Sequence, residues 1–328
     1  MSGTVEYIPT VETVAPIEDC GRGHACSFCP EEDSCTLDKA NHSKVHMQQR
    51  LSKMNWIIPV MANKGGVGKS TVSANLAVAL AQLGYAVGLA DADIHGPNAA
   101  RLFGMQNEKV KVTGRGINAP EYEIAGRGES TGRSNSTSRG TLRVGSLAFF
   151  LEEFDTPVVW RDAYKHDYIH HMLGSFDWGV LDFLIVDMPP GTGNELITLG
   201  DVLKGCNTSA LLVTSADAIA LQDTRKAARY CKESALPILG VVENYAGTIC
   251  PHCGGEFDMF PRAPEAEAFE QQGIATLARL PFTPAIGAGA AAGAPVAGDI
   301  NSPMHGVFAA LATTCRDELI AQQRKMMS

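Results

Sequence analysis

The chain has few basic residues for its length of 328 residues, and its acidic residues outnumber them. Its 27 lysines and arginines stand against 36 aspartates and glutamates, which gives a formal net charge of −9 at pH 7. A broad surface that binds nucleic acid or an acidic membrane requires an excess of positive charge. The composition therefore argues against both kinds of partner.

Long apolar runs are missing as well. No stretch of about eighteen apolar residues occurs, so no transmembrane helix is expected. The first twenty residues, MSGTVEYIPTVETVAPIEDC, have neither the basic start nor the apolar stretch of a signal peptide. We therefore expect a cytoplasmic protein. In that reducing compartment the nine cysteines are expected to be metal ligands or buried thiols rather than disulfides.

A glycine-rich turn, NKGGVGKS over 63–70, separates an apolar strand from an Ala/Val/Leu-rich helix. Glycines let the backbone N–H groups surround an anion, and the helix N-terminus adds partial positive charge. Lys69 is placed to reach the β- and γ-phosphates, and Ser70 to ligate Mg²⁺. The turn is therefore predicted to bind ATP through these residues: Asn63, Lys64, Gly65, Gly66, Val67, Gly68, Lys69, Ser70 and Thr71.

Two positions depart from the common form of this loop. Asn63 replaces a glycine, and asparagine tolerates left-handed backbone angles better than other side-chain-bearing residues. Lys64 adds a second lysine, which would be redundant within one subunit. It is either a solvated loop charge or a group that reaches the phosphates of a facing subunit, as an in-trans finger does. The loop resembles the deviant Walker A loop of the MinD, ParA and nitrogenase iron protein superfamily, whose members work as nucleotide-sandwich dimers.

Apolar strands alternate with helices from residue 56 onward, which indicates a doubly wound, mostly parallel α/β sheet with helices on both faces. We expect one P-loop ATPase domain over 55–328, preceded by a tail, a cysteine cluster and a linker over 1–54. The segment 126–140 contains no apolar residue and is expected to be a loop. The final helix, from about residue 305 to 327, places Phe308, Leu311, Cys315 and Leu319 on one face, which should pack on the body. The predicted strands are 56–61, 86–90, 142–147, 183–186, 210–214, 238–242 and 276–280, and the clearest internal helices are 72–83 and 221–234.

Carboxylates follow two of these strands. Asp187 ends an apolar strand and fits the carboxylate that holds Mg²⁺, while the nearby Gly191 would present its N–H to the γ-phosphate. Asp91 and Asp93 follow the second strand, at the edge of the sheet where ligands bind. We expect Asp93 to position the attacking water and Asp91 to serve the Mg²⁺ side or a structural role. Asn244 ends another strand with the donor and acceptor that reading adenine requires.

Cys250 and Cys253 form a CPxC pair directly after that strand. Two thiolates do not complete a four-ligand metal site. A two-fold dimer with this loop at its axis would bring four thiolates together, which predicts a bridging [4Fe–4S] cluster. A half-zinc site and a redox dithiol are the alternatives.

Four more cysteines, Cys20, Cys26, Cys29 and Cys35, lie within sixteen residues. A short acidic tail cannot bury this many thiols, so metal binding is favoured. Their spacing, with proline after Cys29, is similar to ferredoxin-type cluster loops. Structural zinc is the alternative, because spacing alone does not fix the metal. Cys206, Cys231 and Cys315 stand singly in apolar patterns and are interpreted as buried structural thiols.

Several motifs occur in one order: the phosphate loop, DADIHGPN, PVVWR, DFLIVDMPPGTG, ALQDTRKA, PILGVVEN and CPHCGG. That order resembles the Mrp/ApbC iron–sulfur carrier ATPases over about residues 55–300, and the N-terminal cysteines resemble those of the eukaryotic cytosolic scaffold branch. The resemblance implies a homodimer or close heterodimer that binds a labile [4Fe–4S] cluster at CPxC. It also implies slow ATPase activity and delivery of the cluster to apo-proteins. The chain departs from the family at Asn63, at Asn194 in place of aspartate, and in its short Cys20–Cys26 spacing.

Two other functions were weighed against a cluster carrier. A nucleotide-gated electron donor similar to the nitrogenase iron protein would also use a bridging cluster, but would retain it and reduce a partner. A MinD- or ParA-type positioning ATPase would carry a basic patch or tail, whereas only Arg324 and Lys325 lie near the end of this acidic chain.

Overall fold

The structure is a computed structural model, and it describes residues 34–36, 39–94, 96–113, 116–124, 140–151, 162–191, 194–250, 252–259, 263 and 268–327. Three of the predicted metal ligands, Cys20, Cys26 and Cys29, lie outside these ranges, as do 126–139 of the predicted loop and the PVVWR motif over 157–161.

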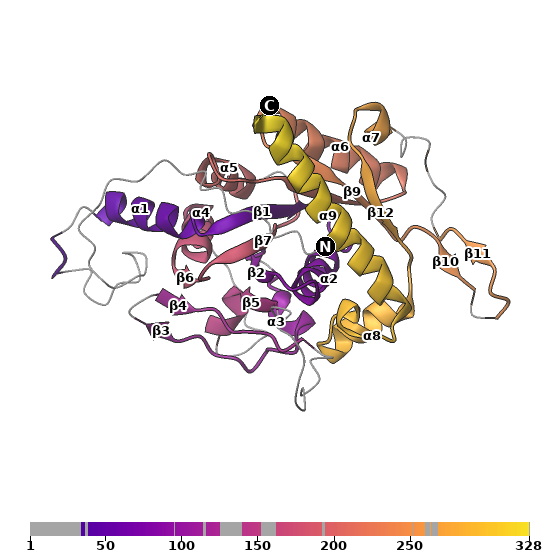
Figure 1. Cartoon of the computed structure of the whole chain (residues 1–328), viewed down its shortest axis with the longest axis horizontal. Coiled ribbons are helices and arrows are strands. Elements are labelled where there is room, and N and C mark those ends of the chain that lie inside the picture. Colours follow the sequence, from indigo (N-terminus) through magenta and orange to yellow (C-terminus); the bar gives the residue numbers. More distant parts are fainter. Residues whose placement is uncertain are drawn as a thin grey trace.

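A seven-stranded sheet with the order β12-β9-β8-β1-β7-β2-β5 forms the centre of the described chain, and every neighbouring pair is parallel (Figure 1). The predicted fold class is confirmed, and each of the seven predicted strands is present. The strand predicted to reach Leu147 ends earlier, because the Ser146 hydroxyl accepts the Ala148 N–H and starts a 3₁₀ turn. The strands are β1 (Met54–Met61), β2 (Ala86–Asp91), β5 (Thr141–Gly145), β7 (Leu181–Asp187), β8 (Ala210–Ser215), β9 (Ile238–Asn244) and β12 (Thr276–Leu280).

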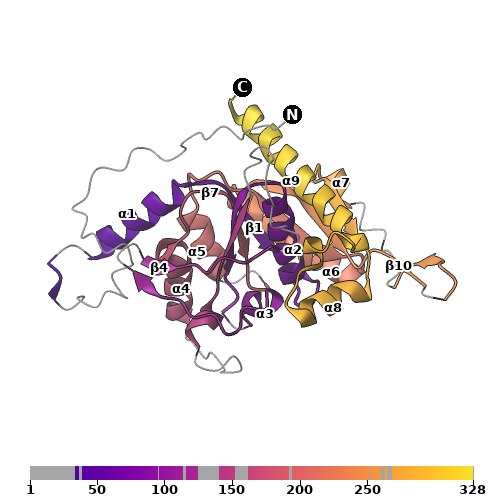
Figure 2. The ribbon, with the colours of Figure 1, turned by 60° about the horizontal axis from the view of Figure 1, so that its bottom comes forward.

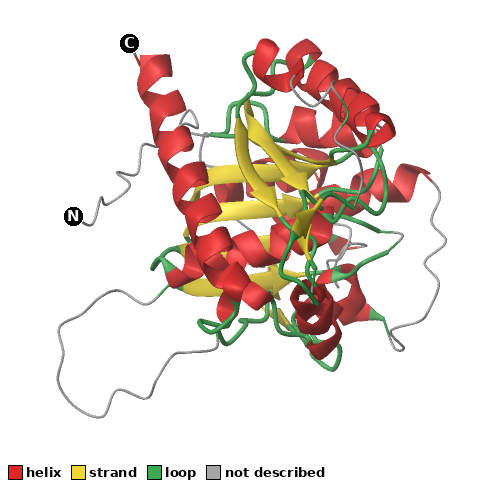
Figure 3. Cartoon of the chain, turned by 90° about the vertical axis from the view of Figure 1, so that its right-hand side faces the viewer, coloured by secondary structure: helices red, strands yellow, loops and turns green. Residues whose placement is uncertain are grey.

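Helices cover both faces of the sheet (Figure 3). Side chains alternate along each strand, so that Ile58 faces one core and its neighbour Ile57 faces the other. One face packs on α2 (Lys69–Gln82), α3 (Ala99–Leu102) and α9 (Pro303–Met327). The other face packs on α1 (Lys39–Leu51), α4 (Asp162–Gly174), α5 (Asn194–Val202), α6 (Ala218–Glu233) and α7 (Ala268–Gln271).

Short elements surround this core. A hairpin of β10 (Thr248–Ile249) and β11 (Glu256–Phe257) projects from the body, and α1 lies at the opposite end of the molecule (Figures 1 and 2). None of the helices within the described ranges is long and apolar enough to cross a membrane. The remaining elements are β3 (Val112–Thr113), β4 (Gly116–Asn118), β6 (Phe176–Asp177), α8 (Pro284–Ala292) and the 3₁₀ turns η3 (Leu147–Phe150) and η5 (Val296–Gly298).

The long helix α9 lies against α2 on one face of the sheet (Figure 1). Phe308, Leu311, Cys315 and Leu319 are each no more than 1% exposed, as the helical spacing predicted. This stripe therefore belongs to the core rather than to an outer surface.

Replacing one of these side chains should destabilise the whole domain. We expect Phe308→Ala to lower the free energy of unfolding by about 3–5 kcal/mol, because it removes buried apolar surface and leaves a cavity. The exposed Arg324→Ala on the same helix serves as the control and should stay within about 0.5 kcal/mol of wild type. Urea unfolding measures both, and equal midpoints for the two variants would contradict the packing described.

Candidate functional site

The carboxyl ends of the parallel strands meet at one edge of the sheet, and the predicted site residues follow those ends. Asp91 ends β2 and Asp187 ends β7, and the two are paired in register on neighbouring strands. The glycine-rich loop follows β1, and Asn244 ends β9. Chain topology thus gathers residues that are far apart in the sequence.

The glycine-rich loop has the backbone shape that an anion cradle requires. Gly66 and Gly68 have φ values of 84° and 86°, in the left-handed region that favours glycine. A Cβ atom on Gly68 would lie 2.2 Å from the amide nitrogen of Asn244, whereas one on Gly65 or Gly66 would meet no atom within 4 Å. The side of the loop at Gly65 and Gly66 is therefore open, and α2 begins directly after it without a side-chain cap.

Lys69, Ser73 and Asp187 form a buried polar cluster behind the loop. The Lys69 Nζ lies 2.7 Å from Oδ1 of Asp187, and the Ser73 hydroxyl donates to the same oxygen at 2.9 Å. The Lys69 Nζ also lies 3.4 Å from the Ser70 hydroxyl. The cluster brings together the lysine, the hydroxyl and the carboxylate that a phosphate–Mg²⁺ site uses.

Asp91 is wholly buried and holds neighbouring backbone. Its Oδ2 accepts the Ala99 N–H at 2.9 Å and the Ser146 hydroxyl at 3.0 Å. Burial and the nearby charge of Asp187 raise the pKa of Asp91 to about 7, against the opposing effect of these hydrogen bonds. Of the two roles expected for Asp91, the contacts fit the structural one.

Asp93 lies two residues further along, in the turn that follows β2. Its Oδ1 accepts the Gly96 N–H at 3.2 Å, and its own N–H points to Asp91. The Asp93 carboxylate therefore holds the turn after β2, and Asp93 is half-buried, whereas Asp91 is buried.

Gly191 and Asn244 each donate a hydrogen bond to a backbone carbonyl in the glycine-rich loop or directly before it. The Gly191 N–H donates to the carbonyl of Ala62 at 3.2 Å, so a contact with a phosphate would require this N–H to change partner. The Asn244 side-chain amide donates to the carbonyl of Val67 at 2.8 Å, so its donor serves the loop itself. Its carbonyl oxygen and its second N–H are the groups left for a base.

Asn63 does not adopt a left-handed backbone angle, although asparagine would tolerate one at this position. Among the described residues, positive φ values outside glycine occur at Ala235 and Tyr245, and Asn63 is not one of them. Asparagine therefore fits this position without backbone strain.

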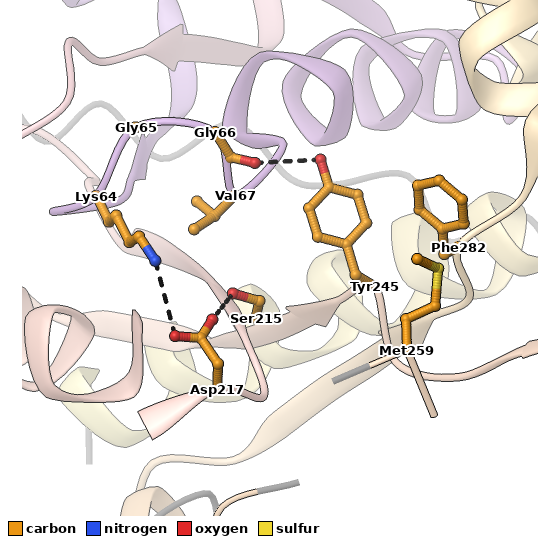
Figure 4. Close-up of a pocket in the computed structure, with 9 residues that line it drawn as sticks. All are labelled: Lys64, Gly65, Gly66, Val67, Ser215, Asp217, Tyr245, Met259 and Phe282. Carbon is orange, nitrogen blue, oxygen red and sulfur yellow. Dashed lines mark hydrogen bonds and ion pairs between the residues drawn. The ribbon is translucent and has the colours of Figure 1, made fainter. Parts of the chain in front are cut away.

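A cavity of about 360 Å³ adjoins the outer side of the loop (Figure 4). The Lys64 Nζ points to Asp217 at 3.7 Å, and 41% of the lysine side chain is exposed. Partial burial opposes ionisation of Asp217, but hydrogen bonds from the Ser215 hydroxyl and the Ala220 N–H, with the charge of Lys64, outweigh it and lower the pKa. Gly65, Gly66, Val67, Tyr245, Met259 and Phe282 complete the lining.

The thiol pair lies in the turn of the β10–β11 hairpin. The Cys250 N–H donates to the carbonyl of Gly255, and the Gly254 N–H donates to that of Cys250, both at 2.9 Å. The N–H groups of Cys253 and His252, and the thiol of Cys253, bond to the Cys250 sulfur and lower its pKa. Cys253 is exposed and Cys250 is half-buried.

The other cysteines differ from this pair. Cys231 and Cys315 are buried, as expected for structural thiols, and burial raises the pKa of each to about 12. Cys206 is half-buried, with its pKa raised to about 11 by burial. Cys35 is half-buried and lies four residues before α1. Within the described parts of the chain, no three His, Cys, Asp or Glu side chains are grouped to hold a metal ion.

Several contacts at this edge of the sheet are not among those predicted from the sequence. Ser73 lies one helical turn after Lys69, and that spacing could have placed it at the same carboxylate. Asp217 caps the first turn of α6, a position that the sequence could also have indicated. Tyr168, which donates to the Asp91 carbonyl at 2.7 Å, and Tyr245, which donates to the Gly66 carbonyl at 3.2 Å, gave no such signal.

Comparison with known proteins places this arrangement among related chains. Residues 53–315 match the family described as ParA, NUBPL iron-transfer P-loop NTPase. An iron-sulfur cluster carrier protein of Pyrococcus horikoshii is 37% identical over 237 residues, which are 72% of this chain and 77% of the relative. The cytosolic Fe-S cluster assembly factor CFD1 of Kluyveromyces lactis is 36% identical over 73% of this chain and 80% of its own length.

A solved structure supports the same grouping. The nucleotide-binding protein of Archaeoglobus fulgidus, in complex with ADP, superimposes with a TM-score of 0.62 at 28% identity. The match covers 81% of this chain and 96% of the solved one. The fold is therefore that of a nucleotide-binding relative.

The two classes of cysteine should differ in reactivity. The thiolate is the reactive form, so Cys250 should be alkylated by iodoacetamide at pH 7.5 while Cys231 and Cys315 remain unmodified in the folded protein. As pH rises, the alkylation rate at Cys250 should reach its plateau at a lower pH than that of an ordinary thiol, whose pKa is 9.0. Peptide mass spectrometry follows each site, and equal rates at Cys250 and Cys315 would contradict the assignment.

Proposed function

The chain belongs to the ParA family of NUBPL-type iron-transfer P-loop NTPases, and on that basis we propose that it carries iron–sulfur clusters to apo-proteins, with ATP and Mg²⁺ bound at the strand ends and a labile [4Fe–4S] cluster shared between two chains. The observation that carries the proposal is the position of the thiol pair. The hairpin that holds Cys250 and Cys253 follows the carboxyl end of β9, at the same sheet edge where the phosphate loop follows β1.

The nucleotide half of the site rests on the buried cluster around Lys69. An ATP molecule would place its β- and γ-phosphates in the loop, where Lys69 turns from Asp187 toward them. Ser70 and Asp187 would hold Mg²⁺, which neutralises charge on these phosphates. The open side of Gly65 and Gly66 leaves room for the anion, and Asn244 offers its carbonyl oxygen to the adenine edge.

Slow hydrolysis is part of the proposal. Asp93 positions the attacking water, and the Gly191 N–H moves from Ala62 to the γ-phosphate. Loss of that phosphate lets Gly191 return. The segment after β7 therefore changes its contacts with each turnover.

Lys64 connects the nucleotide to a second chain. Its ammonium pairs with the partly exposed carboxylate of Asp217 at 3.7 Å, and such pairs contribute little stability. Lys64 would leave Asp217 and bind the phosphates of the facing subunit. The protein would then act as a homodimer, or as a heterodimer with a close paralogue.

The cluster half of the site needs ligands from two chains. Cys250 and Cys253 supply two thiolates, and the depressed pKa of Cys250 favours the form that binds iron. A [4Fe–4S] cluster takes four. Phe257, Met259 and Phe282 are exposed apolar side chains on or beside the hairpin, which a partner chain would cover.

The N-terminal cysteines would hold a second metal group. Cys20, Cys26, Cys29 and Cys35 are assigned to an iron–sulfur cluster, with structural zinc as the alternative. We propose an ATPase domain over 55–328, to whose core the preceding segment over 1–54 adds α1 and Met54, the first residue of β1. Cytoplasmic iron–sulfur apo-proteins are the proposed clients.

Removing one thiolate of the pair should abolish the shared cluster. The four N-terminal cysteines are first changed to serine, so that any iron counted belongs to the hairpin. After anaerobic reconstitution, this parent should bind about four iron atoms per two chains, and Cys253→Ser close to none. Cys206→Ser is the matched control and should equal the parent. Unchanged iron in Cys253→Ser would overturn the shared-cluster assignment.

The role of Lys64 can be tested in metal-free protein. Lys64→Ala should weaken the dimer formed with Mg²⁺ and a non-hydrolysable ATP analogue by about ten-fold or more, since it removes a charge-assisted contact to phosphate. Sedimentation velocity measures the association. Lys226→Ala, which removes another exposed lysine paired with an aspartate, should behave as wild type. Wild-type association in Lys64→Ala would rule out the in-trans contact.

Cluster delivery separates the carrier from an electron donor. A carrier loses its cluster to an apo-ferredoxin-type acceptor within minutes. A protein that keeps its cluster and instead reduces a partner when ATP is added would fit the nitrogenase-like alternative.

A further inference from the structure

We propose that Tyr245 is a positioning residue that transmits occupancy of the phosphate loop to the thiol hairpin. The proposal rests on the carrier function above, and it names how the two halves of that site communicate.

Two consecutive carbonyls of the loop are held by two consecutive side chains at the end of β9. The Asn244 side-chain amide donates to the carbonyl of Val67 at 2.8 Å. The Tyr245 hydroxyl donates to that of Gly66 at 3.2 Å (Figure 4). Tyr245 adopts a φ of 58°, a left-handed angle that is rare for an aromatic residue. Such backbone angles persist where the surrounding structure enforces them, often at switch regions.

The far side of Tyr245 reaches the base of the hairpin. Its ring meets that of Phe282 edge to face, with centroids 5.8 Å apart. The Phe282 N–H donates to the carbonyl of Gly247 at 2.8 Å, and its carbonyl accepts the Thr248 hydroxyl at 2.6 Å. Thr248 is the first residue of β10, and Cys250 follows two residues later. A continuous set of contacts therefore runs from the loop to the thiols.

The peptide between Gly66 and Val67 supplies the physical link. Its carbonyl and its N–H lie in one rigid plane. When the Val67 N–H donates to a phosphate, the peptide becomes more polarised and its carbonyl becomes a stronger acceptor. The hydrogen bond from Tyr245 is thereby strengthened, and the base of the hairpin becomes less mobile.

Hydrogen–deuterium exchange of the metal-free protein tests this coupling without any cluster. In wild type, Mg²⁺ with a non-hydrolysable ATP analogue should slow exchange of the amides over 246–259 by about five-fold, the change in opening equilibrium that one hydrogen bond supplies. Tyr245→Phe keeps the ring and removes the hydroxyl. Because coupling is reciprocal, it should bind the analogue about five-fold more weakly than wild type, and at saturating analogue it should show no slowing in the hairpin.

Tyr230→Phe is the matched control, because its hydroxyl also donates to a backbone carbonyl, that of Leu196 at 2.8 Å, away from the loop. It should keep the full wild-type response. Phe282→Leu breaks the same path at the ring contact, and it should lose the response even if Tyr245→Phe does not fold.

Three results would overturn the inference: no slowing in wild type with analogue bound, a wild-type response in Tyr245→Phe, or loss of the response in Tyr230→Phe. Each of these leaves the carrier function standing if the wild type still delivers clusters. Failure of wild type to bind the analogue at all would instead contradict the proposed function as well.

Discussion

The paired hydrogen bonds from Asn244 and Tyr245 to the phosphate loop tie β9 to β1 across the intervening strand β8. They exist because parallel strands deliver their carboxyl ends to one edge of the sheet. The close approach of Asn244 also requires a glycine at position 68, because a Cβ atom there would collide with the Asn244 side-chain amide. The shape of the loop and the position of the thiol hairpin are therefore set by the same few contacts.

The buried charges behind the loop are better explained by function than by stability. Taking a lysine and two carboxylates out of water costs free energy that their mutual attraction does not reliably return. Burial and the charge of Asp187 raise the pKa of Asp91 to about 7, hydrogen bonds from Ala99 and Ser146 offset part of this cost, and Lys69 and Asp187 pair directly. In the proposed site, Lys69 would exchange Asp187 for a phosphate and so keep a charged partner throughout. A P-loop NTPase can thus keep these buried charged side chains, because the phosphates of its substrate would supply the charged group that Lys69 pairs with.

Much of this architecture could be predicted from the sequence. Apolar runs gave the seven parallel strands, and the spacing of Phe308, Leu311, Cys315 and Leu319 gave the buried face of α9. The motifs that contain Lys69 and Asp187 are visible in the sequence because each lies at a strand end, and the structure pairs the two side chains. Tyr245 could not be found in this way. Its role depends on a left-handed backbone angle and on a carbonyl 179 positions away in the sequence, and no local pattern encodes either.

We propose that one edge of the sheet both binds nucleotide and controls the release of a metal cluster. The most direct test is the half-time of cluster transfer to an apo-ferredoxin-type acceptor, measured with the N-terminal cysteines replaced by serine. Transfer should be slower with Mg²⁺ and a non-hydrolysable ATP analogue bound than with Mg²⁺ and ADP. Equal half-times with both nucleotides bound would contradict the claim.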